Sequence, residues 1–219
     1  MSKLLIVFAL FIALVHAEQL VPLSKNSYGI TFGPADASLH LEVFYDLNCP
    51  YCKAQDALLE EIFSENDIKG LRITYHQFPL PLHRNAFILA KATRVIGALL
   101  GDKEAIRFAQ YIFKNQDKFS NANTYKLSNE QVEQLIALQA RTLFGNKVSD
   151  SEISNGLRDD NIERTTRLDY KYGLSRGVNG TPKNHANGVP IDGSGDYKKE
   201  QWIKLFSEYA IVTPKKQKI

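Results

Sequence analysis

Cysteine is scarce in this chain: its 219 residues include only Cys49 and Cys52. Two residues separate them, so they cannot link distant parts of a fold. A structural zinc site needs four ligands, and there is no second CxxC or neighbouring His-x-x-x-His to complete one. Position 53 is Lys53, not the histidine of a CxxCH haem attachment. A redox pair, an inert disulfide and a metal ligand pair remain, and the small stabilisation from so short a disulfide loop favours the redox use.

Long apolar runs are also scarce. The longest spans residues 4–15, follows Lys3 and leads to small or apolar residues at Val15 and Ala17. It is shorter than the roughly 20 residues that a membrane span needs, but it fits the apolar region of a secretory signal peptide. The sequence predicts a signal peptide at residues 1–17, with an uncleaved anchor as the alternative. We expect a secreted, lumenal or periplasmic protein with no stable membrane insertion after signal cleavage.

An excess of charge of one sign is absent, since 27 basic residues face 24 acidic ones. This small balance argues against a polyanionic partner, so nucleic-acid binding is not expected. Residues 18–219 have the length of one domain, or of one domain that carries an insertion. The basic end of the chain, residues 213–219, is expected to be a solvated tail.

The chain begins its folded part with a β-α-β pattern. Residues 39–45 and 71–76 alternate apolar and polar side chains, which predicts two strands. Pro50 stands where the first turn of a helix tolerates proline. One apolar helical face is marked by Ala54, Leu58 and Ile62 with Leu59 and Phe63. Because a helix connects them, the two strands should be parallel with a right-handed crossover.

A helical segment follows, over residues 84–172. Four or five helices fit its length, and capping-box spacing places two of their starts at Ser128 and Ser149. Residues 177–195 are rich in Gly, Asn and Pro, which indicates turns and short strands. A final helix is expected to bury Trp202, Leu205, Phe206 and Tyr209. The pattern therefore predicts a β-containing frame with an inserted helical block.

The two cysteines lie where the first strand turns into a helix. Cys49 would stand at the helix N-terminus, where free N–H groups and the helix dipole favour a thiolate. Cys52, one turn further along, should be more shielded, so Cys49 is predicted to attack and Cys52 to resolve. Pro50 stiffens the turn. Tyr51 brings no positive charge, so the disulfide should be less oxidising than one beside a histidine.

Three segments resemble DsbA-like thioredoxin-fold proteins, in the order that this family has them. They are residues 43–53 (VFYDLNCPYCK), 78–86 (FPLPLHRNA) and 177–182 (GVNGTP). The resemblance implies an α/β thioredoxin-like fold with a mixed central sheet, β-α-β then β-β-α, interrupted by a helical domain. Residues 18–83 and 173–212 would form the thioredoxin-like domain, and residues 84–172 the insertion.

The resemblance also implies that Pro182 is a cis proline beside the cysteine pair. Thr181 could then pair with an extended substrate segment next to Cys49. The chain departs from the family after Pro182, where residues 183–186 (KNHA) replace the usual apolar strand. This polar stretch is expected to be frayed, bulged or at a sheet edge, with His185 on the surface.

The predicted function is thiol-disulfide exchange with protein or peptide substrates. The oxidising compartment favours the oxidase or isomerase direction, with an unidentified redox partner to restore the pair. No cofactor and no metal are required. Two alternatives stay open: a glutaredoxin-like reductase, because CPYC is also the glutaredoxin tetrapeptide, and a redox-inactive peptide-binding or holdase module.

Overall fold

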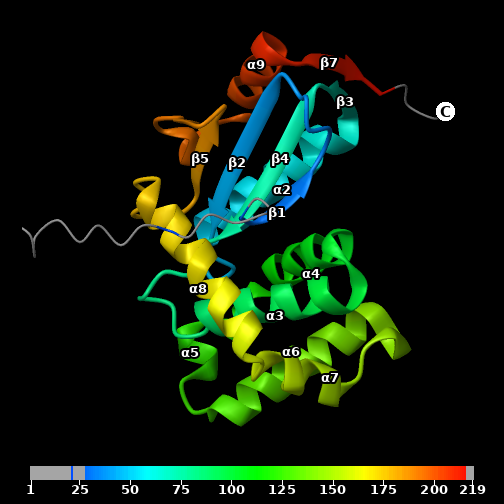
Figure 1. The fold of residues 1–219 in the computed structure, drawn as a ribbon, viewed down its shortest axis with the longest axis vertical. Helices are drawn as coiled ribbons and strands as arrows, with labels where there is room; N and C mark the ends of the chain where they lie inside the picture. Colours follow the sequence, from blue (N-terminus) through cyan, green and yellow to red (C-terminus); the bar gives the residue numbers. More distant parts are fainter. Residues whose placement is uncertain (1–20, 22–27, 216–219) are drawn as a thin grey trace, which may run out of the picture.

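The computed structural model describes Val21 and residues 28–215, so the predicted signal peptide lies outside the described residues. A mixed sheet with strand order β1-β4-β2-β5-β6 forms the frame (Figure 1). The parallel pair expected from the β-α-β pattern is β2 with β4, and the other pairs are antiparallel. The strands are β1 (Ile30–Phe32), β2 (Leu39–Tyr45), β4 (Leu71–Gln77), β5 (Lys183–Ala186) and β6 (Val189–Pro190).

Helices between and after these strands complete the expected thioredoxin-like fold with a helical insertion. The sheet is accompanied by α2 (Pro50–Glu65), α9 (Lys199–Tyr209) and the 3-10 helix η3 (Ser194–Asp196). Between β4 and β5 stand α3 (Ala86–Leu100), α4 (Asp102–Lys114), η1 (Gln116–Phe119), α5 (Asn121–Thr124), α6 (Asn129–Phe144), η2 (Gly145–Lys147), α7 (Asp150–Leu157) and α8 (Asp160–Ser175). Four or five helices were expected there; the short α5 is a single turn that leaves no periodic pattern. The capping boxes at Ser128 and Ser149 are both present.

A second, two-stranded sheet was not expected from the sequence. It pairs β3 (Asn66–Lys69) with β7 (Ile211–Pro214), antiparallel. The predicted tail therefore starts too early, because Thr213 and Pro214 belong to β7 and the Lys215 ammonium donates to the Phe63 carbonyl at 2.7 Å. Residues 216–219 lie outside the described part.

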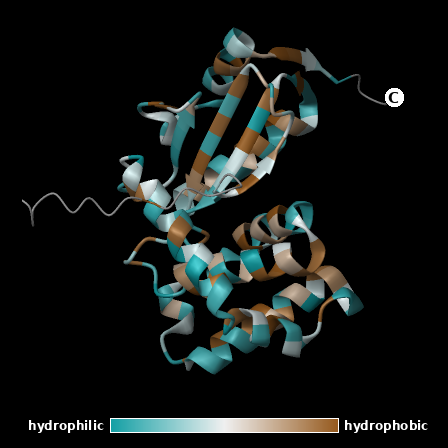
Figure 2. Cartoon of the chain, in the orientation of Figure 1, coloured by the Kyte–Doolittle hydropathy of each residue, from teal (hydrophilic) through white to brown (hydrophobic). Residues whose placement is uncertain are grey.

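The main core begins between the sheet and α2 and continues without a break into the inserted helices. Alternate residues of β2 point into it, and Figure 2 shows the resulting alternation of apolar and polar positions along this strand. On α2 the expected Leu59 and Ile62 are buried, and Leu58 and Phe63 are partly buried against the core. Two positions differ from the prediction: Gln55 is buried and Ala54 is exposed. In α9 the expected Trp202 and Phe206 are buried, but Tyr209 is 49% exposed because the helix ends there.

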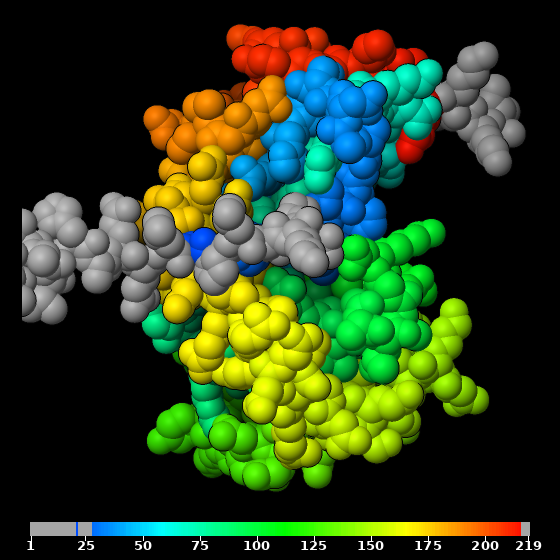
Figure 3. Space-filling model, in the orientation of Figure 1, coloured from blue at the N-terminus to red at the C-terminus, as the bar shows by residue number. Residues whose placement is uncertain are grey.

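The opposite face of the sheet carries buried polar groups. His76 on β4 places its Nδ1 2.8 Å from Asp169 Oδ1 on α8, and Asp169 Oδ2 accepts from Arg94 of α3 at 2.8 Å. The Tyr172 hydroxyl on α8 donates to Glu42 of β2 at 2.7 Å. These contacts fasten α8 to the sheet, and Figure 3 shows α8 reaching from the helical block to it. No helix within the described residues is long and apolar enough to cross a membrane.

Candidate active site

The CPYC segment occupies the junction of β2 and α2. Cys49 is the N-cap of α2, in an extended conformation, and Pro50 is the first helical residue, as expected. The Cys49 N–H donates to the Asp46 carbonyl at 3.0 Å, which closes the turn after β2. Cys49 and Cys52 are both buried free thiols, and Tyr51 between them is 66% exposed. The buried cysteines therefore anchor the segment on both sides of Tyr51, whose ring faces the solvent.

The local environment shifts the pKa values of the two thiols in opposite directions. A hydrogen bond from the Cys52 thiol, together with backbone N–H groups of the first helical turn and the side chain of Thr181, lowers the pKa of Cys49 to about 6 against the opposing effect of burial. Burial and the neighbouring Cys49 raise the pKa of Cys52 well above its ordinary value. At neutral pH this arrangement holds one thiolate and one thiol within a single helical turn, as nucleophilic exchange requires.

Thr181 and Pro182 lie against the pair. The peptide bond between them is cis, as the family resemblance implies. Cys49 Sγ is 3.3 Å from the Thr181 carbonyl oxygen, to which the thiol donates. The structure thus brings together the site residues predicted from two separate sequence segments, 43–53 and 177–182.

The polar strand after Pro182 differs from the sequence prediction. β5 is not at an edge, because it pairs with β2 on one side and with β6 on the other. Asn184 and His185 are both 0% exposed, so the prediction that His185 lies on the surface is wrong. Asn184 is hydrogen-bonded by Gln55 and Ser194, and the His185 ring lies 5.1 Å from that of Phe44. Burial lowers the pKa of His185, which favours the neutral ring that such a site accepts.

Asp46 and His83 meet behind the cysteines. In the structure Asp46 Oδ2 accepts from His83 Nδ1 at 2.7 Å and from the Leu80 N–H at 2.9 Å, and the Asp46 N–H points at Cys52 Sγ from 3.5 Å. The buried Asp46 carboxylate therefore ties the FPLPLHRNA segment to the cysteine turn.

The helical insertion contributes one residue that sequence reasoning missed. Gln116 of η1 is buried, and its Nε2 lies 2.9 Å from the carbonyl oxygens of both Leu47 and Cys49. Next to it, Asn48 Nδ2 donates to the Phe119 carbonyl at 3.0 Å. No motif marks Gln116, because its role depends on a contact between distant segments.

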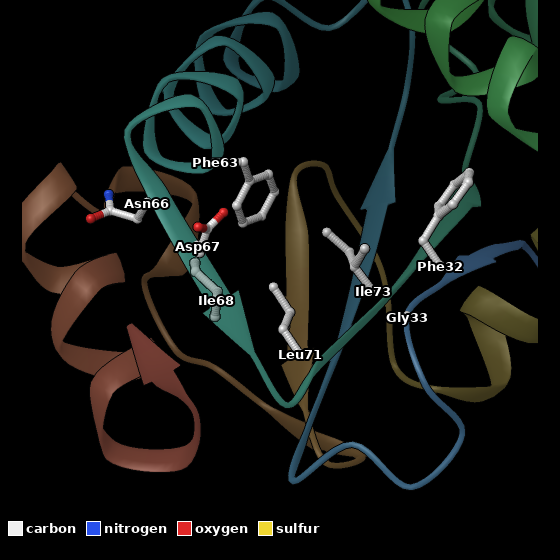
Figure 4. A pocket seen from close by; sticks show the side chains of 8 residues that line it. All are labelled: Phe32, Gly33, Phe63, Asn66, Asp67, Ile68, Leu71 and Ile73. Carbon is white, nitrogen blue, oxygen red and sulfur yellow. The ribbon is translucent and has the colours of Figure 1, made fainter. Parts of the chain in front are cut away.

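A separate pocket of about 250 Å³ lies away from the cysteines. Phe63, Leu71 and Ile73 point into it from the end of α2 and from β4 (Figure 4). Cys49 stands at the other end of α2, so this pocket is not part of the candidate active site. Among the described residues, no group of three or more His, Cys, Asp or Glu side chains is arranged to hold a metal ion.

Comparison with known proteins identifies the class. A family model described as thioredoxin matches residues 25–204, which includes the CPYC segment and the cis proline. The chain belongs to the thioredoxin family, and its fold with inserted helices is shared by the solved structures described next. No curated protein matches the chain.

Solved structures share the fold at low sequence identity. BdbD from Bacillus subtilis is 14% identical with a TM-score of 0.65, over 83% of this chain and 92% of that one. The catalytic domain of Proteus mirabilis ScsC is 21% identical with a TM-score of 0.60, over 85% and 92%. The thiol-disulfide exchange protein α-DsbA2 from Wolbachia pipientis is 18% identical with a TM-score of 0.62, over 83% and 86%. These structures confirm the expected thioredoxin-like fold, and one of them is described as a thiol-disulfide exchange protein.

Proposed function

We propose that the chain is an exported protein thiol-disulfide oxidoreductase that acts through Cys49 and Cys52. The observation that carries this proposal is the opposite shift of the two thiols, with the pKa of Cys49 near 6 and that of Cys52 raised. Pro50 and Tyr51 shape the turn, and Thr181 and Pro182 form the adjoining backbone. The family match supports the chemistry, and the DsbA-like structures support protein thiols as the general kind of substrate.

The oxidative reaction runs in two exchanges. A substrate thiolate attacks Sγ of Cys49 in the oxidised pair, the Cys49–Cys52 bond breaks, and Cys52 leaves as a thiolate that takes up a proton. A second substrate thiolate then attacks the substrate sulfur of the mixed disulfide, which forms the substrate disulfide and releases Cys49 as a thiolate. Two electrons pass from the substrate dithiol to the enzyme, and a redox partner protein removes them.

The low pKa of Cys49 favours the last step. A sulfur that is stable as a thiolate is a good leaving group, so release of the oxidised substrate is fast and the reduced enzyme is stabilised. Both effects favour the oxidase or isomerase direction. We further propose that residues 1–17 direct export, that residues 18–83 and 173–212 form the catalytic domain, and that residues 84–172 form its insertion.

The first test is the reduction potential of the pair in purified residues 18–219, measured against glutathione buffers with alkylation of the free thiols. We expect a value of roughly −180 to −120 mV, in the range of protein disulfide isomerase and DsbA. A reduction potential of about −270 mV would instead indicate a reductase. A pair that never equilibrates would favour the peptide-binding alternative.

The second test uses Cys49→Ser with a reduced, unfolded protein as substrate. Loss of all disulfide formation is expected, and full activity of this variant would exclude the proposal. Exchange that requires glutathione, and that is absent with protein thiols alone, would favour the glutaredoxin-like alternative.

A further inference from the structure

A buried group of three polar side chains lies directly below the cysteine pair. Gln55 of α2 follows Cys52 by three residues, so it lies one helical turn below it. Asn184 of β5 lies two residues after Pro182, and strand periodicity points both toward the same face. Asn184 pairs with Val43, whose side chain is in the main core on the side of α2. The two amides therefore meet on the side of the sheet where the cysteines stand.

The two amides form a reciprocal pair. Gln55 Nε2 donates to Asn184 Oδ1 at 3.0 Å, and Asn184 Nδ2 donates to Gln55 Oε1 at 2.8 Å. Two antiparallel hydrogen bonds between planar groups fix both distance and orientation, which a contact between apolar side chains does not. The amide pair links α2 to β5. It is a second link between these parts of the chain, beside the contact of Cys49 Sγ with the Thr181 carbonyl.

Ser194 closes the group from the other side. Its hydroxyl accepts the second Asn184 Nδ2–H at 3.0 Å. The next residue, Gly195, packs so closely on Pro182 that an added Cβ would lie 3.3 Å from the Pro182 carbonyl oxygen. All three side chains are buried, so their hydrogen bonds do not compete with solvent.

We propose that Gln55, Asn184 and Ser194 are positioning residues that hold the Thr181–Pro182 backbone in register with Cys49. This role explains why the strand after Pro182 is polar in this chain: the hydrogen bonds that order it run through the side chains. The inference rests on the proposed function, in which Cys49 is the attacking thiol. Without these hydrogen bonds, the Thr181 side chain, which helps to lower the pKa of Cys49, loses its fixed place beside Cys49 Sγ.

The test is the pH profile of Cys49 alkylation by iodoacetamide in the reduced protein. Burial keeps Cys52 protonated, so the reaction reports Cys49. In Asn184→Leu and Gln55→Met we expect reaction roughly threefold to tenfold slower at pH 5, below the wild-type midpoint, equivalent to a pKa rise of about 0.5 to 1, with the same plateau at high pH. Ser194→Ala removes one hydrogen bond of the three and should give a smaller change in the same direction, so the proposal stays testable if the larger changes impair folding.

Two further variants separate positioning from a general loss of stability. Thr93→Val removes another fully buried hydroxyl, bonded only within α3, and should leave the profile unchanged. The exchange Gln55→Asn with Asn184→Gln keeps the summed length of the two side chains and should restore the wild-type profile. Three outcomes would each overturn the inference. The pH profiles of all variants could superimpose, Thr93→Val could shift as much as the other variants, or the exchanged pair could fail to recover the wild-type profile.

The wild-type curve separates this inference from the proposed function. If the wild-type profile has its midpoint at about 6 and the midpoints of the variants do not differ from it, only the positioning role is rejected. A wild-type midpoint at the ordinary thiol value of 9.0 rejects the proposed function, and the inference with it.

Discussion

Cys49 and Cys52 are three residues apart on one helix, yet their pKa values shift in opposite directions. Cys49 is at the end of α2, where N–H groups have no partner within the helix and can donate to sulfur. Cys52 is inside the first turn, and burial dominates its titration. The division into attacking and resolving thiol therefore follows from the position of each residue relative to the end of the helix.

Replacement of the resolving thiol should arrest exchange halfway. In Cys52→Ser the Cys49 thiolate still attacks a substrate disulfide, but nothing within the enzyme can release the product. We expect mixed disulfides with substrate to accumulate, visible as larger species on non-reducing gels and abolished by dithiothreitol. The matched control is Cys49→Ser, in which the remaining thiol is buried and protonated. Equal trapping by both variants would contradict the assignment.

The exposed ring of Tyr51 offers a way to tune the potential. Tyr51→His places a ring that can carry positive charge beside the Cys49 thiolate without disturbing the core, because the position is 66% exposed. The pKa of Cys49 should fall further and the pair should become more oxidising, by about 30 mV for each 1.4 kcal/mol of added stabilisation of the reduced form. Redox titration of Tyr51→His beside Tyr51→Phe measures this, and equal potentials would exclude a role of charge at this position.

The candidate site could be predicted from sequence only where it is local. The helix start at Pro50, the CxxC spacing and the cis proline each depend on a short segment. Gln55 and Asn184 are 129 residues apart, and Gln116 is 67 residues from Cys49. Nothing in the neighbourhood of either partner shows that a polar side chain will find a buried amide, so Asn184 was expected in a frayed strand.

Contacts between elements explain how the polar face of the sheet is tolerated. Burial alone would lower the pKa of His76, but the hydrogen bond with Asp169 and the ion pair with Glu42 at 3.3 Å outweigh it and raise the pKa. Burial would likewise raise the pKa of Glu42, whereas the ion pair with His76 and the hydrogen bond from Tyr172 hold it at about 2. A protonated His76 therefore links β4 to α8 through paired charges.

This link has a defined dependence on pH. Because the pKa of His76 is raised in the folded state, its contribution to stability is full below pH 6.5 and is lost as the pH rises through the folded value. We expect the stability difference between wild type and His76→Gln, from urea unfolding, to shrink as the pH rises above 6.5.

His185, on the same face of the sheet, is a matched control for His76 because its pKa shifts in the opposite direction. Its pKa is lowered, so its contribution is present above pH 6.5 and is lost as the pH falls. The difference between wild type and His185→Gln should therefore shrink toward acid. Parallel pH curves for the two differences would show that the two histidines do not titrate as the contacts require.

Secondary structure could be predicted where periodicity or capping was long enough to read. The capping boxes at Ser128 and Ser149 and the alternation of β2 gave correct elements. β3 and β7 have four residues each and are mostly exposed, so neither has an apolar alternation. Their pairing depends on the return of the chain to the end of α2, a tertiary event that local patterns do not contain.

At the scale of the whole molecule, the helical insertion is part of the candidate active site. Gln116 holds two carbonyls of the cysteine turn, and the Phe119 carbonyl binds Asn48 of that turn and Asn85 before α3. Asn184 and Ser194 hold the other side of the site from within the thioredoxin-like frame. The cysteine turn is thus held between two parts of the chain, and its thiolate is coupled to the fold of both.

That coupling predicts how the stability of the reduced protein varies with pH. The folded state lowers the pKa of Cys49 from 9.0 to about 6, so the thiolate adds stability that is full above pH 9 and is lost as the pH falls through 6. Between these limits the slope is about 1.4 kcal/mol per pH unit. Cys49→Ser lacks the titrating group, so the difference in unfolding free energy between wild type and this variant isolates the effect.

The measurement is urea unfolding of both proteins in excess phosphine reductant from pH 5 to pH 9. From pH 5 to pH 7 the wild type should gain about 1.4 kcal/mol relative to Cys49→Ser, and the gain should continue to pH 9. The same pair in Asn184→Leu should show a smaller gain at pH 7, because the Thr181 side chain, which helps to lower the pKa of Cys49, is no longer held beside it. If the difference in unfolding free energy between wild type and Cys49→Ser does not change with pH, the fold does not stabilise the Cys49 thiolate. The oxidising character inferred for the pair would then have no physical source.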